Sequence, residues 1–447
     1  MSKRRTPMWF RLPVDAGPPP LVSEAVGIER IVAHPSASYE MVVTVLDSEE
    51  GRLLRADVVV AHRSRDGEGE WYVSSPTWPG LPDEVSYELD SSGELPPHIR
   101  RRLNLFLRQA PIAPFATMEL ERRAFTLRGP DGDLVDVCDD VVTIIRDGQV
   151  RSRSREITME PRVKLDGQQR EFIHSAMAAI DAVPLDRLPT LQERIGAPAT
   201  GLTSFRPPLG IDKRMSLEEF VSEIFLMHLH SLMLSELEGT TAVTREELSL
   251  IFRDLRGLSP VLEPSWREAL EVDLKALPCA VEEDREPILL RVIDALVSAV
   301  RAPKVGDVGA EPARKVLFAR TEQALLILFD RCRGLGKSSS DEAWAAALRS
   351  AEQLDAASAI LEPLFEKPLR KARRELETVL DGLRMSVRPP VDIEVVGLSP
   401  AEAFQLGRDV EHAQWSVDRA RRLFIESWPE RVPKVRKALV KMRKKLQ

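Results

Sequence analysis

The sequence predicts an α+β protein in which an antiparallel β barrel is followed by an all-helical bundle. Between residues 8 and 162, short segments of alternating apolar and polar residues are separated by clusters of Gly, Pro, Asp and Ser, which is typical of strands and turns. Beyond Met215, apolar residues recur at helical spacing almost throughout. The chain has 447 residues, which is long for one hydrophobic core, so we expect two domains.

The composition is that of a soluble globular protein, with 43% hydrophobic and 30% charged residues. The 63 Lys and Arg residues against 70 Asp and Glu residues give a formal charge of −7, so no general attraction to DNA is expected. No apolar run approaches the roughly 20 residues needed to cross a bilayer. The basic start of the chain is not followed by an apolar segment of about 7–15 residues. We therefore expect a cytoplasmic protein without a membrane partner.

Ten segments of the first half have the strand pattern, and many short, evenly spaced strands favour a closed or nearly closed barrel. They are residues 9–12, 28–32, 39–46, 56–63, 70–74, 85–89, 117–128, 134–138, 141–146 and 156–162. A helix is expected over residues 97–109, because Pro96 and Pro97 suit a helix start. In the segment 46–63, a turn is expected to lead into an extended run that places Leu54, Ala56, Val58 and Val60 on one face.

Residues 167–195 have helical spacing and are expected to pack on the barrel, which completes a first domain over residues 1–196. The Gly and Pro content of residues 197–214 suits a linker. Residues 215–447 form the predicted helical domain. Its expected helices are residues 216–238, 244–258, 264–276, 285–300, 311–333, 340–361, 367–383, 399–427 and 430–445.

The segment 46–63 resembles the signature of the CYTH (triphosphate tunnel) superfamily. Asp47, the run Arg52-Leu53-Leu54-Arg55-Ala56 and Arg63 carry this resemblance. The helical half that follows resembles a CHAD domain, with Arg245, Leu255, Arg256 and Pro260 near its first motif. The resemblance implies a tunnel barrel in which carboxylates hold Mg²⁺ or Mn²⁺ and inward Lys and Arg hold a triphosphate.

The sequence departs from the family pattern where the resemblance implies the metal site. The family's opening Glu-x-Glu-x-Lys falls on Arg5, Pro7 and Trp9, which argues against turnover. The remaining anion-binding candidates in the barrel are Arg63, Arg122 and Arg123, and the remaining metal candidates are Asp139, Asp140, Glu156 and Glu160. Adjacent strand residues point to opposite faces, so at most one of Arg122 and Arg123 lines a tunnel. A solvated outer face explains the row of Glu156 and Glu160 as readily as a lumen does.

The helical half has lost most of the basic positions that the CHAD resemblance implies, since the first family histidine falls on Ala242 and later basic positions fall on Glu352, Gln353 and Asp355. The basic segment 431–445 contains Lys437 and Lys441, which could hold an anionic polymer or an acidic partner. The same cations could simply complement the dipole of a terminal helix. His228 and His230 are expected in the core or an interface, because a spacing of two does not place them on one helix face.

The resemblance thus implies a degenerate CYTH–CHAD protein that binds polyphosphate, triphosphate or another phosphate-rich anion without turnover, or that serves as a scaffold. Two alternatives stay open. One is a metal-dependent inorganic triphosphatase that uses Asp139 or Asp140 with Glu156 and Glu160. The other is a helical module that binds a protein partner and no phosphate ligand.

Overall fold

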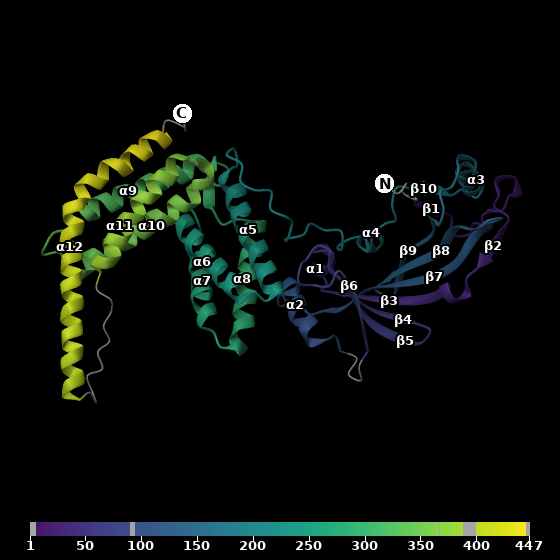
Figure 1. Ribbon diagram of the computed structural model, residues 1–447, viewed down its shortest axis with the longest axis horizontal. Coiled ribbons are helices and arrows are strands. Elements are labelled where there is room, and N and C mark those ends of the chain that lie inside the picture. The colour runs from purple at the N-terminus through teal and green to yellow at the C-terminus, as the bar shows by residue number, and fades with distance from the viewer. Residues whose placement is uncertain (1–5, 90–93, 366, 388–398, 444–447) are drawn as a thin grey trace. The chain divides into compact units, whose positions relative to one another are not determined.

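The structure, a computed structural model, has an antiparallel sheet of ten strands followed by a helical region (Figure 1), as the sequence predicts. It describes residues 6–89, 94–365, 367–387 and 399–443. The chain divides into two compact units, which are treated separately below. The sheet unit comprises residues 1–206 with 237–239, and the helical unit comprises residues 207–236 with 240–447. The division falls inside the stretch 197–214.

All strands belong to one sheet, paired in the order β10-β1-β9-β8-β7-β3-β4-β5-β6, with β2 added to β7. The strands are β1 Met8–Leu12, β2 Arg30–Ala33, β3 Tyr39–Asp47, β4 Val59–Arg65, β5 Glu68–Ser74, β6 Glu84–Glu88, β7 Ala113–Gly129, β8 Gly132–Arg146, β9 Gln149–Pro161 and β10 Val183–Leu185. Every pairing is antiparallel.

Two Asp-Gly turns help to set the register of this sheet. Asp66-Gly67 joins β4 to β5, and Asp147-Gly148 joins β8 to β9. All four residues have positive φ, between 53° and 86°. A two-residue hairpin turn of this type matches the right-handed twist of the strands that it joins, and Asp and Gly tolerate its left-handed backbone.

Helices cover parts of both faces of the sheet. The helices of the sheet unit are α1 Arg52–Arg55, α2 Pro97–Leu107, α3 Gly167–Ala178 and α4 Leu191–Ile195. Ile173 and Met177 of α3 pack in one core cluster with Phe10, Ile157 and Met159. Ile195 of α4 belongs to a second cluster, with Val43, Val142 and other side chains of the opposite face.

Three sequence predictions for the sheet unit are wrong in detail. The segments 134–138 and 141–146, expected as two strands, form the single strand β8. The expected extended run through Leu54 is instead the short helix α1, and β4 begins only at Val59. The continuous helical segment expected over 167–195 contains β10 between α3 and α4. In these last two places hydrogen bonds decided the conformation: those of the buried Asp47 side chain before α1, and those that pair β10 with the distant strand β1.

The helical unit contains eight α-helices within the described residues. They are α5 Leu217–Glu238, α6 Thr241–Leu258, α7 Pro264–Ala276, α8 Glu282–Arg301, α9 Ala313–Arg333, α10 Asp341–Phe365, α11 Lys367–Ser386 and α12 Pro400–Arg443. The two terminal helices expected from the sequence are one helix, because α12 continues through Pro429 and Pro433. Trp428 packs there against Phe329 of α9 and Phe424 of α12, which holds both halves of the helix on one core.

Close packing of α6 on α10 needs a glycine. A Cβ atom on Gly257 of α6 would lie 2.5 Å from the carbonyl oxygen of Ala356 in α10, so no larger residue fits without moving the backbone. Gly257 therefore brings the end of α6 directly onto α10. None of the helices in the described ranges is both long and apolar enough to cross a bilayer.

Candidate functional site

Charged residues predicted from the sequence lie on both faces of the sheet. Directly paired residues of neighbouring antiparallel strands share a face, so Tyr39, Arg122, Asp140, Glu156 and Arg11 form one continuous row. By the period of two, Arg63 and Glu160 lie on this same face, which we call the first face. Asp139 and Arg123 pair with each other on the second face.

The carboxylates of the first face are engaged by arginines. Asp140 accepts two hydrogen bonds from Arg122, at 2.8 and 2.7 Å, and Glu156 accepts two from Arg194 of α4, at 2.8 and 2.6 Å. The Asp140 and Glu156 residues are 9% and 3% exposed. The hydrogen bond to Asp140 raises the pKa of Arg122 above its ordinary value, although burial opposes the charge. Bidentate pairs of this kind are strong and use the charge of both partners.

The second face repeats this arrangement with different partners. Arg155 donates two hydrogen bonds to Asp139, at 2.8 and 2.6 Å, in a pair whose side chains are 10% and 8% exposed. The hydrogen bond to Asp139 also raises the pKa of Arg155. Arg123 is exposed on this face and pairs with Glu121 at 2.7 Å, whereas Glu160 is exposed on the first face. Asp139 and Asp140 therefore have separate arginine partners on opposite faces.

These residues do not fit the Mg²⁺ or Mn²⁺ site that the tunnel resemblance implies. A hard divalent cation needs several oxygen ligands aimed at one point. Here the buried carboxylates are each bound to an arginine, and Asp139 is on the other side of the sheet. In the described part of the chain, no group of three or more His, Cys, Asp or Glu side chains is placed to hold a metal ion.

Of the two predicted anion-binding residues on the first face, Arg63 is less engaged by acids than Arg122. Its guanidinium lies over the ring of Tyr72, 3.2 Å from the ring centroid, and its nearest acid is Glu70 at 3.8 Å. Its Nε is buried and makes no hydrogen bond to the described residues. A cation stacked on a tyrosine with a long ion pair keeps donor capacity, but it is a single charge.

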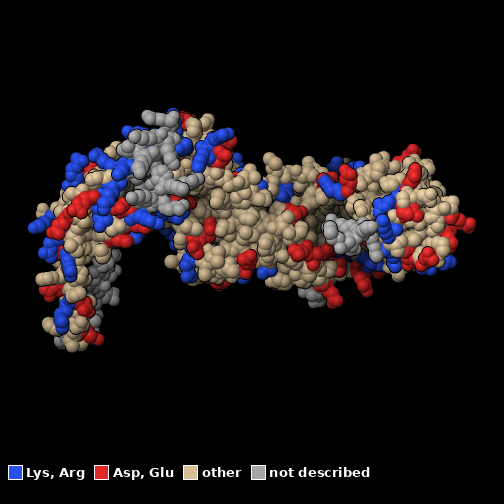
Figure 2. Space-filling view, turned by 45° about the horizontal axis from the view of Figure 1, so that its top comes forward, with Lys and Arg blue, Asp and Glu red and all other residues tan. Residues whose placement is uncertain are grey.

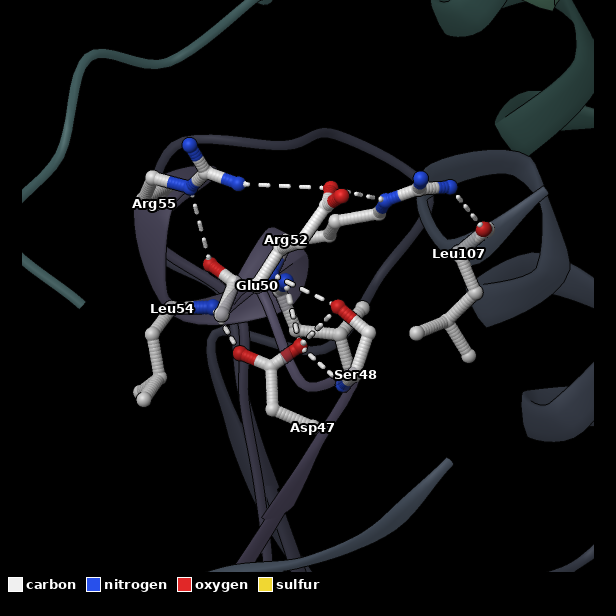
Figure 3. A network of polar contacts seen from close by, with 9 residues as sticks. Asp47, Ser48, Glu50, Arg52, Leu54, Arg55 and Leu107 are labelled. Carbon is white, nitrogen blue, oxygen red and sulfur yellow. Dashed lines mark hydrogen bonds and ion pairs between the residues drawn. The ribbon is translucent and has the colours of Figure 1, made fainter. Parts of the chain in front are cut away.

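The turn that begins at Asp47, which carries the tunnel resemblance, stabilises the start of α1 (Figure 3). The carboxylate of Asp47, 1% exposed, accepts hydrogen bonds from the backbone N–H groups of Ser48, Leu53 and Leu54 at 2.6 to 2.9 Å. It thereby satisfies the free donors at the start of α1. Burial raises the pKa of Asp47, and the three N–H donors offset part of that rise.

Arginines of the same turn also point to backbone and acid partners. Arg52 donates to the carbonyl of Leu107 at 2.8 Å and pairs with Glu50 at 3.0 Å, and Arg55 lies 3.9 Å from Glu50 (Figure 3). The turn ties α1 to the end of α2. The residues that make the sequence resemble a tunnel protein therefore stabilise the local fold.

The helical unit contains a pocket of about 490 Å³ that the sequence did not reveal. It is bounded by α9, α10 and the end of α6, and we call it the arginine pocket. Its polar lining residues are Ser259, Arg320, Gln323, Arg331, Arg349, Ser350 and Gln353. None of the lining residues that the structure describes is acidic. Three arginines thus line one cavity, and two of them, Arg320 and Arg331, have no carboxylate partner among the described residues.

Helical periodicity places these arginines together. Arg320, Gln323, Ile327 and Arg331 lie at i, i+3, i+7 and i+11 on one face of α9. Arg320 is exposed and has no ion pair among the residues described, and Arg331 donates to the carbonyl of Ala346 at 2.7 Å, which leaves its charge uncompensated. Arg349 of α10 is paired with Glu342, which lies outside the pocket lining.

The base of the arginine pocket is held by contacts between α6 and α10. Gln353 donates to the carbonyl of Arg256 at 2.8 Å and lies 3.3 Å from the hydroxyl of Ser259. The close approach at Gly257 is adjacent to both residues. Gln353 falls where the CHAD resemblance implies a basic residue, yet its amide positions the pocket wall.

The spacing of Arg320 and Arg331 was the sequence signal for this site. It was missed because the arginines of the two helices are not consecutive in sequence, and only packing of α9 on α10 brings them together. Lys437 is exposed on α12, whereas the side chain of Lys441 lies outside the described residues. Acidic and basic side chains are interspersed on the face shown in Figure 2.

A buried charged cluster in the helical unit involves His228, one of the two neighbouring histidines. His228 is 8% exposed, with Nδ1 2.6 Å from Glu247 and Nε2 3.1 Å from Asp254. Ser231 donates to Glu247 at 2.8 Å, and Arg253 donates to Asp254 at 2.7 Å. Burial alone would lower the pKa of His228, but the hydrogen bonds to Asp254 and Glu247 outweigh burial and raise it to about 9. This cluster joins α5 to α6.

No family model matches the sequence, and no curated protein matches it. Among solved structures, a putative adenylyl cyclase from Hippeastrum, described as having a dominant triphosphatase activity, is 12% identical. The match covers 43% of this chain and 98% of that one, with a TM-score of 0.25. A putative adenylate cyclase from Bacillus halodurans is 11% identical over 37% of this chain and 93% of that one, with a TM-score of 0.20.

These neighbours are of the adenylyl cyclase and triphosphatase type and correspond to the N-terminal part of the chain. Similarities this distant carry no argument about chemistry. The CHAD resemblance of the helical unit stays a prediction.

Proposed function

We propose that this protein binds a phosphate-rich anion, with inorganic polyphosphate as the first candidate, and that the arginine pocket of the helical unit is the binding site. The observation that carries the proposal is that Arg320, Arg331 and Arg349 line one cavity whose described lining residues include no acid. Guanidinium groups suit phosphate because their planar donors match its oxygens. The serine and glutamine side chains of the lining add neutral donors.

The sheet unit supports binding less well than the helical unit does. Arg122 and Arg123 each have a carboxylate partner within 2.8 Å, so an anion would have to displace it. Arg63 keeps a free buried donor and is the one predicted residue of the sheet that could contribute to a second, weaker site. The pairing of Asp140 and Glu156 with arginines supports a binding role without turnover.

The test is a calorimetric titration of the whole protein with polyphosphate, repeated at several salt concentrations. We expect salt-sensitive binding, because each released counterion makes affinity fall with ionic strength. The triple variant Arg320→Gln, Arg331→Gln and Arg349→Gln is expected to bind at least tenfold more weakly.

A matched triple variant controls for net charge. Arg291, Arg384 and Arg422 are solvent-facing arginines of the same unit that do not line the pocket. Their replacement by Gln removes the same charge and should change affinity less than twofold. Equal losses of affinity in both triple variants would show that only the overall electrostatic field of the protein attracts the anion. Absence of binding in the natural protein would overturn the proposal.

Phosphate release from tripolyphosphate with Mg²⁺ or Mn²⁺ separates binding from the alternative triphosphatase. We expect no release above a control without protein. Release that disappears in Glu156→Gln would instead establish the enzyme. If neither binding nor release is measured, the helical unit is best studied as a protein-interaction module.

A further inference from the structure

A second pocket of the helical unit lies on a different face of α9 and is lined by larger apolar side chains. Its volume is about 410 Å³, and it is formed by the end of α9 and the part of α12 that contains Pro429 and Pro433. We call it the proline pocket. Phe329, Leu335, Ile425, Trp428 and Val432 supply its apolar surface. Its volume lies within the range of small-molecule sites, about 300–1,000 Å³.

Polar groups at this pocket come from two arginines and from the backbone. Arg333 and Arg436 are exposed lining residues, and neither has an ion pair within the described part of the chain. Arg436 lies 5.9 Å from the centroid of the Phe329 ring, so its charge is held beside the apolar surface. The lining contains no acidic residue among those described.

The two prolines change the backbone of α12 at the pocket. Proline has no N–H, so the carbonyl oxygens of Ile425 and Pro429 lack the donor that a helix normally supplies four residues later. Both residues line the pocket. The helix α12 is bent in Figure 1, as expected for a helix with internal prolines. A break in the helix thus coincides with a hollow between α9 and α12.

We propose that the proline pocket binds a small amphipathic carboxylate, whose hydrocarbon body contacts Phe329 and Trp428 and whose head group pairs with Arg333 and Arg436. The apolar surface favours burial of a hydrocarbon chain, and a carboxylate matches the guanidinium fork in a bidentate pair. Aromatic side chains, Phe329 and Trp428, line this pocket, whereas none of the described lining residues of the arginine pocket is aromatic. The two pockets of the helical unit are therefore assigned different anions.

The surroundings of Cys332 agree with this assignment. Its side chain is 3% exposed at the pocket wall, and burial raises the pKa of its thiol to about 12. The wall is thus apolar even beside two arginines. A ligand held here would lie against a hydrophobic surface with its charge at the rim.

The experiment uses dodecanoate, below its micelle concentration, as the probe and calorimetry on the whole protein as the readout. We expect binding to the natural protein, and at least tenfold weaker binding to the double variant Arg333→Gln with Arg436→Gln. The Lys versions at both positions should recover part of the affinity because they keep the charge. The uncharged methyl ester of dodecanoate should bind at least tenfold more weakly than the acid.

A brominated dodecanoate locates the bound chain, since bromine quenches a tryptophan that it touches. Quenching should fall in Trp428→Phe, and circular dichroism would show that this variant remains folded. Arg320→Gln is the control, because it alters the arginine pocket and should leave dodecanoate binding unchanged. No binding, equal binding of acid and ester, or loss of affinity in Arg320→Gln as large as in the double variant would overturn the proposal.

Discussion

Arginines of the buried pairs in the sheet unit and arginines of the arginine pocket in the helical unit have different surroundings. In the sheet, Arg122, Arg155 and Arg194 each make two short hydrogen bonds to one buried or half-buried carboxylate. In the helical unit, Arg320 and Arg331 line a cavity without an ion pair to any described acid. Arginines of the first kind stabilise the fold, and those of the second kind are available to a ligand.

This difference shows why residue type alone is a poor guide to a binding site. All the arginines predicted from the sheet sequence are present where the strands should place them. Their role depends on the neighbouring side chains. Each arginine has an acid next to it, either on the paired strand or two residues away on its own strand. Four predictions follow from this comparison, beginning with the largest effect.

The buried pair of the second face gives the largest expected effect. Replacement of Asp139 by Ala leaves the charge of Arg155 buried without its partner, which should cost about 3–5 kcal/mol of unfolding free energy. Hydrogen exchange of the β8 and β9 amides, measured by mass spectrometry, reports this loss within the sheet unit. The double change Asp139→Leu with Arg155→Met should recover most of it. An unchanged exchange rate in Asp139→Ala would mean that the pair does not stabilise the sheet.

The second prediction concerns the pH dependence of the helical unit. The folded-state pKa of His228 is about 9, against about 6.5 in an unfolded chain, so its hydrogen bonds stabilise the fold below pH 6.5. This contribution, on the order of 3 kcal/mol, should be lost as pH rises through 9. Urea unfolding followed by hydrogen exchange of α5 and α6 measures it.

Two variants serve as controls for His228. His228→Gln should remove this pH dependence, since Gln does not titrate, while His230→Gln should leave it in place. The same slope in the natural protein and in His228→Gln would assign the effect to another group.

The third prediction tests the arginine pocket one residue at a time. Arg320→Gln should weaken polyphosphate binding about fivefold to tenfold, close to 1 kcal/mol, and should lower the salt slope by about one. Calorimetry over a salt series measures both quantities. Arg123→Gln removes an exposed, paired arginine of the sheet and should have little effect. A larger loss in Arg123→Gln would place the anion on the sheet.

The fourth prediction, with the smallest expected effect, tests whether ion pairing of Arg122 alone keeps the sheet from binding anions. In the triple Gln variant of the arginine pocket, Asp140→Asn should free Arg122 and raise polyphosphate affinity about threefold, less than 1 kcal/mol. Asn keeps the shape of the side chain and one acceptor oxygen, so the fold should persist. If affinity stays at the level of the triple variant, the first face is closed to anions for another reason, such as coverage by α4.

Much of the fold was predictable from the sequence because its signals are local. Alternation of apolar residues indicated the strands, and helical spacing indicated the helices from α5 to α11 with ends that mostly agree within a few residues. The exceptions have identifiable causes. The carboxylate of Asp47 turned residues 52–55 into a helix, and aromatic packing at Trp428 carried α12 through two prolines.

The candidate site was much less predictable than the fold. The alternation of side chains along β7 correctly places Arg122 and Arg123 on opposite faces. It does not show that Arg122 binds Asp140 or that Arg155 binds Asp139. The pairing of Arg194 with Glu156 was not predictable, because the two residues are 38 apart in sequence and only the packing of α4 brings them together. The two pockets of the helical unit depend on contacts between helices that no periodicity within one helix records.

The sequence by itself determined that a sheet is followed by a helical region, on which face each strand residue lies, and where arginines occur along the chain. Local backbone preferences and the burial of apolar residues are enough to decide these features. Only the tertiary structure decided which arginines are paired and which line a cavity. That outcome depends on side chains from separate elements meeting within about 3 Å, the range over which a hydrogen bond forms.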